Sequence, residues 1–199
     1  MQMNVLEAVG ALAGAVSVYL SARENIWNWP IAIVNLAVYV IVFEHTGLYS
    51  DMGLQVVFLV LSVYGWYAWL HGGGNQREFT VRHASSRDWF DAAVVAFAFW
   101  AILARNTAGL PGVAMPYLDS GLATVSLVAQ WMMTRKMLEN WILWILVDLV
   151  YIPVYVYKGL PLTAALYAVF LALASLGLHA WWRSYRVVRV AELTSGTGR

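Results

Sequence analysis

An aspartate lies in the middle of an apolar segment that is long enough to cross a membrane. The stretch Glu139–Gly159 (ENWILWILVDLVYIPVYVYKG) carries Asp148 about halfway along. A helix advances about 100° per residue, so five of its side chains fall within one arc of roughly 80°: Trp141, Trp144, Asp148, Tyr151 and Tyr155. An ionisable side chain at the bilayer centre costs several kcal/mol and is expected to face a cavity that provides a partner.

The residues around Asp148 indicate what that partner is. No Lys or Arg lies at a comparable depth in any apolar segment of the chain. A carboxylate without an internal cation is either protonated or awaits a cation from outside. The faces of Trp and Tyr rings also attract cations. The pattern favours a flat, positively charged organic ligand, and the alternative is a protonated Asp148 that is hydrogen-bonded across helices.

Polar side chains at helical spacing also mark two other apolar segments. In the segment at 118–133 the face consists of Asp119, Ser126 and Gln130. In the segment at 52–70 it consists of Gln55, Ser62, Trp66 and Trp69. They predict a shared polar space between helices. Direct helix–helix contacts are the alternative for Gln55, Ser62 and Ser126, because Ser and Gln also join membrane helices. We interpret Trp66 and Trp69 as anchors at the membrane–water interface, and Trp141 fits that interpretation as well.

The composition is that of an integral membrane protein. Of 199 residues, 61% are hydrophobic and 12% are charged, whereas soluble domains carry about 25% charged residues. The chain has no Cys, which excludes disulfides, thiolate metal sites and cysteine nucleophiles. Its His residues have no carboxylate neighbours at ligand spacing, so we expect neither a metal nor another cofactor. The expected partners are the lipid bilayer and a small molecule, with no nucleic acid.

Apolar runs of membrane length predict an all-α membrane protein with seven transmembrane helices in a single domain over 1–199. The expected segments are Val5–Leu20, Trp27–Phe43, Met52–Leu70, Trp89–Leu103, Leu118–Met133, Trp141–Tyr157 and Leu162–Trp182. Ten of the 12 Lys and Arg residues fall after the first, third, fifth or seventh segment. By the positive-inside rule, the C-terminus is cytoplasmic and the N-terminus lies outside.

The second half of the chain repeats the first at a spacing of 112 residues. NWPIAIVNLAVYVIVFEHTGL (Asn28–Leu48) aligns without a gap on NWILWILVDLVYIPVYVYKGL (Asn140–Leu160). The repeats cover 5–71 and 117–183, and a linker helix at 88–105 joins them so that both have the same orientation. Parallel repeats are a transporter architecture, with the substrate near mid-membrane between the halves. A duplication that serves structure only is the alternative.

The acidic, aromatic face is not duplicated. At the 112-residue spacing, Asp148 aligns with Leu36 and Trp144 aligns with Ala32. Substrate specificity is therefore expected to rest mainly on the second half. Asn35 provides a polar group near the matching depth in the first half.

Several short motifs resemble the PnuC family of vitamin-precursor transporters. They are EAVGALAG at the start of the first segment, YGWYAW at Tyr64–Trp69, the pair Asp119-Ser120, and NWILW directly after TRKMLE. The Trp-x-x-Trp of Trp141 and Trp144 is the most specific of these motifs. The resemblance extends from Glu7 to Trp182, which is nearly the whole chain.

This resemblance implies a fold, an activity and a site. The implied fold is a three-plus-one-plus-three arrangement of helices similar to that of SWEET sugar transporters, and a homotrimer is favoured. The implied activity is facilitated diffusion of nicotinamide riboside across the bacterial inner membrane, with cytoplasmic phosphorylation trapping the product. The family's site carries over to Trp141, Trp144, Asn140 and Gln130. Together with the residues above, the predicted substrate-binding set is Trp141, Trp144, Asp148, Asn140, Tyr151, Gln130, Asn35 and Gln55.

Asp148 departs from the family pattern, because familiar nicotinamide riboside carriers resembling this chain have Asn four residues after the second Trp. A carboxylate suits the pyridinium of nicotinamide riboside and the thiazolium of thiamine, which related members carry, whereas neutral riboflavin gains nothing from it. We expect the riboside first, with thiamine as the alternative. A proton-coupled carrier that uses Asp148 is a further alternative. An enzyme is not expected, because the chain shows no nucleophile or metal motif.

Overall fold

The computed structural model describes residues 2–46, 49–72, 79–107 and 116–196. Within these residues the chain forms seven helices, α1 (Gln2–Ala22), α2 (Asn28–Thr46), α3 (Tyr49–His71), α4 (Ser86–Thr107), α5 (Pro116–Thr134), α6 (Asn140–Tyr157) and α7 (Pro161–Gly196). The prediction of an all-helical protein with these seven elements is confirmed. α7 is longer than expected, because it continues beyond Trp182.

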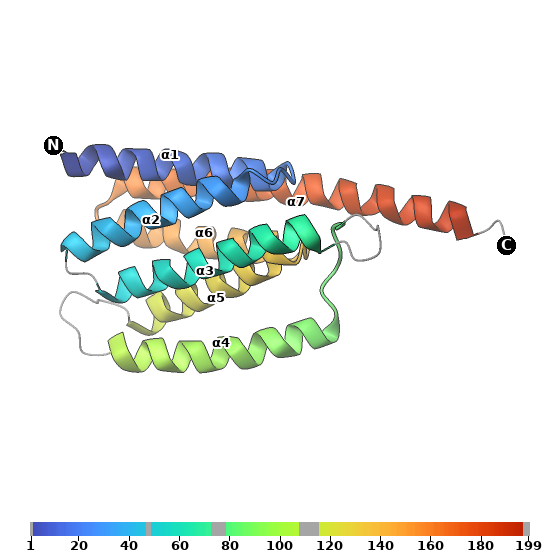
Figure 1. The fold of residues 1–199 in the computed structure, drawn as a ribbon. Helices are drawn as coiled ribbons and strands as arrows, with labels where there is room; N and C mark the ends of the chain where they lie inside the picture. Colours follow the sequence, from blue (N-terminus) through green and yellow to red (C-terminus); the bar gives the residue numbers. More distant parts are fainter. Residues whose placement is uncertain (1, 47–48, 73–78, 108–115, 197–199) are drawn as a thin grey trace.

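Six of the helices form a closed ring, in which each packs against its neighbours. The order around the ring is α1, α2, α3, α5, α6 and α7, and α7 packs back against α1. α4 lies outside the ring against α5, at the edge of the bundle (Figure 1). The end of α7 projects beyond the bundle, and the start of α1 lies at the opposite end of the molecule (Figure 1).

Four of the described helices are long and apolar enough to cross a membrane on length and composition alone. These spans lie in α2, α3, α6 and α7, and α1 carries a shorter apolar stretch at Val9–Ala22. α5 holds Ser126 and Gln130, and α4 holds Asp91 and Arg105, so both are less apolar than a solitary lipid-facing helix. The polar residues of α5 can lie in a membrane because the ring covers them.

The α1–α2 and α5–α6 corners follow the same backbone path. Glu24 has φ 52° and Lys136 has φ 50°, and among the described residues they are the non-glycine positions with positive φ. The side chain of Asn28 donates to the backbone oxygen of Asn25 at 2.8 Å, and Asn140 donates to Met137 at 2.6 Å. A left-handed residue costs about 1–3 kcal/mol and persists only where its surroundings fix it. These asparagine hydrogen bonds help to fix both corners.

A tryptophan pair follows each corner. The rings of Trp29 and Trp69 meet edge to face with centroids 5.4 Å apart, and those of Trp141 and Trp181 meet in the same way at 5.4 Å. A glycine faces each inner ring: a Cβ added at Gly177 would come within 2.7 Å of the Trp141 ring, and Gly65 lies against Trp29 in the same manner. Glycine therefore permits the close helix contact at this level.

The interpretation of Trp69 and Trp141 as interface anchors is wrong. Trp141 is fully buried, and Trp69 packs in the core between the rings of Trp29 and Trp181. The Trp69 indole N–H also donates to the backbone oxygen of Met133 at 3.2 Å. Trp66, in contrast, remains exposed at the bundle surface. Spacing along one helix did not separate the two rings, because only the neighbouring helices decide which of them is covered.

The segment that leads into α4 is attached to the α5–α6 corner. The backbone N–H of Arg82 donates to the Lys136 oxygen at 3.0 Å, and the N–H of Leu138 donates to the Arg82 oxygen at 2.9 Å. Glu139 accepts hydrogen bonds from His83 at 2.7 Å and from the backbone of Ala84 at 2.9 Å. This strap, residues 79–85, holds the corner from outside the ring.

Candidate functional site

A cavity of about 350 Å³ lies inside the helix ring. All six ring helices contribute to its wall, and α4 does not. The volume falls in the range of about 300–1,000 Å³ that is typical of sites for small organic molecules. The ring therefore encloses one central site between its two halves.

Seven of the eight predicted substrate-binding residues line this cavity. They are Trp141, Trp144, Asp148, Tyr151, Gln130, Asn35 and Gln55. They come from α2, α3, α5 and α6, so the ring brings together side chains that are far apart in the sequence. Asn140 is fully buried but does not line the cavity, and its amide holds the start of α6 instead.

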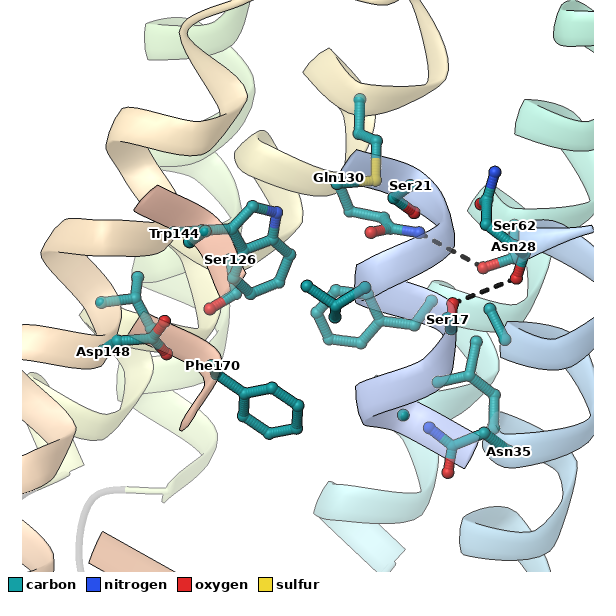
Figure 2. A pocket seen from close by; sticks show the side chains of 18 of the residues that line it. Ser17, Ser21, Asn28, Asn35, Ser62, Ser126, Gln130, Trp144, Asp148 and Phe170 are labelled. Atoms are coloured by element: carbon teal, nitrogen blue, oxygen red, sulfur yellow. Dashed lines mark hydrogen bonds between the residues drawn. The ribbon is translucent and has the colours of Figure 1, made fainter. Parts of the chain in front are cut away.

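Aromatic side chains surround the carboxylate of Asp148. Figure 2 shows Asp148, Trp144 and Phe170 on the same side of the open space. Tyr151 and Tyr167 also line the cavity, and with Tyr155 they form a cluster whose ring centroids are 4.9–5.5 Å apart. Asp148 is 4% exposed, and the described cavity wall contains no Lys, Arg or His. This wall therefore combines one carboxylate with several aromatic rings.

The opposite wall is polar and uncharged. Asn28, Asn35 and the hydroxyls of Ser17 and Ser62 lie there, across the open space from Asp148 (Figure 2). The Ser17 hydroxyl donates to the backbone oxygen of Asn28 at 3.0 Å, and the Gln130 amide donates to Ser62 at 3.3 Å. The Ser62–Gln130 bond joins α3 to α5 and therefore connects the two halves where these neighbouring helices pack together.

Several polar atoms of the lining residues are buried without a hydrogen-bond partner among the described residues. They are the indole nitrogens of Trp29, Trp141 and Trp144 and the side-chain oxygen of Asn35. A buried donor or acceptor without a partner costs about 1–3 kcal/mol, so such atoms call for an explanation. The polar side chains of the cavity lining, among them Asn35, Gln55, Gln130 and Asp148, suit the cavity to a polar molecule with a flat ring.

Several lining residues were not predicted from the sequence, among them Ser17, Asn28, Tyr167 and Phe170. Asn28 had a usable signal, because it is the repeat partner of Asn140 and was shared by both halves. Tyr167 lies on α7, the helix after the one that carries the predicted face, and the spacing of aromatic residues does not indicate which side of α7 faces the cavity. Ser17 had no signal, since single serines occur on many helices. Among the described residues, no His, Asp and Glu side chains group in a way that could hold a metal ion.

Comparison with known proteins places the chain in a family. A family profile described as nicotinamide mononucleotide transporter matches residues 4–183. The chain belongs to the PnuC family. The nicotinamide riboside transporter PnuC of Escherichia coli (strain K12) is 30% identical over 92% of this chain and 87% of its own. The riboflavin/roseoflavin transporter RibM of Streptomyces davaonensis is 27% identical over 88% of this chain and 84% of its own.

The fold agrees with a solved member of the family. A crystal structure of the vitamin B3 transporter PnuC superimposes with a TM-score of 0.71 at 24% identity, over 91% of this chain and 82% of that one. Since its relatives are transporters, the role of this PnuC member is transport and not catalysis. With its apolar helices, it is a multi-pass protein of the inner membrane.

Proposed function

We propose that this protein carries nicotinamide riboside, a flat aromatic cation, through the central cavity by facilitated diffusion. The observation that carries the proposal is the wall formed by Asp148 and its rings, in a cavity whose described lining has no basic side chain. The pyridinium stacks on the Trp144 ring and its charge is balanced by Asp148. The ribose hydroxyls and the carboxamide pair with the opposite wall of Asn, Gln and Ser residues.

The same wall argues against a phosphorylated substrate. The family description names nicotinamide mononucleotide, and its phosphate needs cationic or N–H donors at close range. The described lining offers a carboxylate and no Lys or Arg. Placing a phosphate beside Asp148 in a cavity of low dielectric is costly, because like charges repel there with little screening.

Two other substrates remain alternatives. Thiamine carries a cationic thiazolium, so the charge argument applies to it equally. Riboflavin is favoured by the 27% identical relative that transports it. It is neutral, however, and gains nothing from Asp148. A carrier that couples transport to protons through Asp148 is a variant of the same proposal, in which the carboxylate binds a proton during each cycle.

The proposed architecture is two parallel three-helix repeats, 5–71 and 117–183, with α4 as the linker at 88–105. All seven helices then cross the membrane. The matched corners and tryptophan pairs, which recur at 112 residues, support this arrangement. Each repeat also contacts the other through its first and third helices, α3 with α5 and α7 with α1.

The proposed orientation places the N-terminus outside and the C-terminus in the cytoplasm. The segment that leads into α4 and the α5–α6 corner lie at the same end of the bundle as the α7 extension (Figure 1). These segments carry Arg82, Lys136 and the arginines beyond Trp182, which supports the orientation. Uptake becomes one-way if the riboside is phosphorylated in the cytoplasm. A homotrimer, as the resemblance implies, remains a prediction that the molar mass of the purified protein tests.

Thermal unfolding of the purified protein tests the substrate. A ligand that binds only the folded state raises the melting temperature. We expect nicotinamide riboside to raise it, and nicotinamide mononucleotide and riboflavin to leave it unchanged. A rise with riboflavin and none with the riboside would overturn the proposal. Uptake into liposomes, with and without a pH gradient, then separates facilitated diffusion from proton coupling, since only the coupled carrier accumulates substrate against its gradient.

A further inference from the structure

An ion pair joins the two matched corners at one end of the cavity. The Lys136 ammonium donates to the Glu24 carboxylate at 2.8 Å, and the side chains are only 11% and 24% exposed. The two residues are 112 residues apart, so each is the repeat partner of the other. Two equivalent positions can touch only where the axis that relates the repeats passes between them. This pair therefore marks that axis.

Two hydrogen bonds cross the same axis in a reciprocal manner. The indole N–H of Trp69 donates to the Met133 oxygen at 3.2 Å, and that of Trp181 donates to the Ser21 oxygen at 3.0 Å. Trp69 and Trp181 are repeat partners, and so are Ser21 and Met133. Each half thus reaches into the first helix of the other half, at the turn directly before the corner.

These contacts lie directly beyond the cavity wall. Ser21, Met133, Trp29 and Trp141 line the cavity, whereas Trp69, Trp181 and the ion pair do not. The rings of Trp69 and Trp181 are 6.1 Å apart, and the Lys136 ammonium lies 4.7 Å from the Trp69 ring. Two tryptophans, capped by the ion pair, therefore fill the space between the halves and close the cavity at this end.

We propose that Glu24 and Lys136, with Trp69 and Trp181, form a gate that must separate on every transport cycle. The proposal rests on the transport function argued above. The ion pair, the Trp69–Trp181 ring contact and the two indole hydrogen bonds each join one half to the other, so a small rotation of the halves about their axis breaks them together. The gate opens at the end of the bundle that carries the corners, which is the cytoplasmic end in the proposed orientation.

The chemistry of the pair suits a contact that opens repeatedly. Removing two charges from water costs several kcal/mol, which offsets most of their mutual attraction. When the halves separate, both charged groups regain water, so the ion pair itself adds little to the cost of opening. An apolar plug of the same size would lose burial on opening and regain nothing. The ion pair therefore holds the closed state in one geometry without locking it.

A reversible cross-link tests the gate, and the chain is suited to it because it has no native Cys. In Glu24→Cys/Lys136→Cys, a bis-methanethiosulfonate reagent bridges the two thiols and dithiothreitol removes the bridge. We expect the bridged protein in liposomes to take up nicotinamide riboside no faster than protein-free liposomes, and reduction to restore uptake. Each single-Cys variant, treated in the same way, controls for the added bulk of the reagent. Its uptake rate should be the same before and after treatment.

Two outcomes would overturn the gate. The first is uptake by the bridged protein at the rate of the reduced protein, and the second is failure of the two thiols to be bridged at all. Thermal unfolding distinguishes failure of the gate proposal from failure of the substrate proposal. The bridged protein should still be stabilised by the riboside, because the cavity itself is unchanged. If neither wild type nor variant responds to the riboside, the substrate is wrong, and the same comparison is made with thiamine.

Discussion

The two halves of the ring share a scaffold but differ in chemistry. Both have a corner with a left-handed residue, an asparagine that holds the next helix, and an edge-to-face tryptophan pair. Among the described residues of the cavity wall, only the second half provides a carboxylate and a further indole, Asp148 and Trp144, where the first half has Leu36 and Ala32. The scaffold features are thus present in both copies, whereas the proposed ligand recognition has its charge on one side only.

The corners also differ in how they are held. Residues 79–85 attach to the α5–α6 corner through Arg82 and Glu139. The described residues show no such strap on the α1–α2 corner. The corner of the second half is therefore the more firmly fixed one, and we expect the first half to move more when the gate opens.

The largest effect is expected on the free energy of unfolding, when a buried tryptophan of the shared scaffold is removed. Trp181→Ala should lower the free energy of unfolding by about 3–5 kcal/mol, because it empties a fully buried site. Trp69→Ala, its repeat partner, should cost somewhat less, since Trp69 is only partly buried. Thermal unfolding in detergent measures both, with exposed Trp66→Ala as the control. A large loss for one and none for the other would contradict a scaffold shared by the two halves.

The next largest effect is a loss of ligand affinity, and it should come from a substitution in the second half. Asp148→Asn keeps the size of the side chain and removes its charge, so the affinity for nicotinamide riboside should fall by about 2–3 kcal/mol, the order of the attraction between two unit charges a few ångströms apart at an effective dielectric constant of about 20. The protein should remain folded, because the partner of Asp148 is a ligand that can stay in water. Titration calorimetry measures the change, with Asp91→Asn on α4 as the matched control. Unchanged riboside affinity in Asp148→Asn would make the carboxylate structural.

A smaller effect is expected for the neighbouring ring. Trp144→Ala should weaken binding by about 1–2 kcal/mol, the size of a cation–π contact removed from water. The matched control is Trp89→Ala, which removes an exposed ring on α4. The asymmetry predicts that Ala32→Gly, at the repeat position of Trp144, leaves affinity almost unchanged. If Trp144→Ala and Trp89→Ala bind the riboside equally well, Trp144 is not a binding residue.

The smallest effect is expected on stability, from the ion pair that Arg82 of the strap forms with Asp88. The hydrogen bond from Arg82, at 2.8 Å, holds the pKa of Asp88 well below its ordinary value. The pair therefore adds stability above about pH 4, and that stability is lost as acid protonates Asp88. Because Arg82 is 41% exposed, we expect no more than about 1 kcal/mol. Asp88→Asn should lose this stability at neutral pH and show a flatter acid dependence of its melting temperature, with Asp91→Asn as the control. An acid dependence equal to that of wild type would show that the pair contributes nothing.

Much of the fold was predictable because the signals are local or periodic. Runs of apolar residues predicted all seven helices, and the 112-residue spacing aligned positions whose contacts recur in the structure. The face of α6 that carries Trp144, Asp148 and Tyr151 was predictable as well, since helical spacing alone places the three together. Asn140 was predicted beside them, but it lies one turn earlier, where its amide donates a hydrogen bond to the backbone of Met137 in the corner.

The sequence by itself determined which helices form, which of their faces are polar, and that the only charge at mid-depth in the second half is Asp148. These properties depend on residue type and helical period, which neighbouring helices do not alter. Only the tertiary structure decided that Trp69 is a core residue, that Ser17 and Asn28 face Asp148, and that Glu24 meets Lys136. Such contacts join residues that are far apart in the chain, and they follow from how the six helices close into a ring.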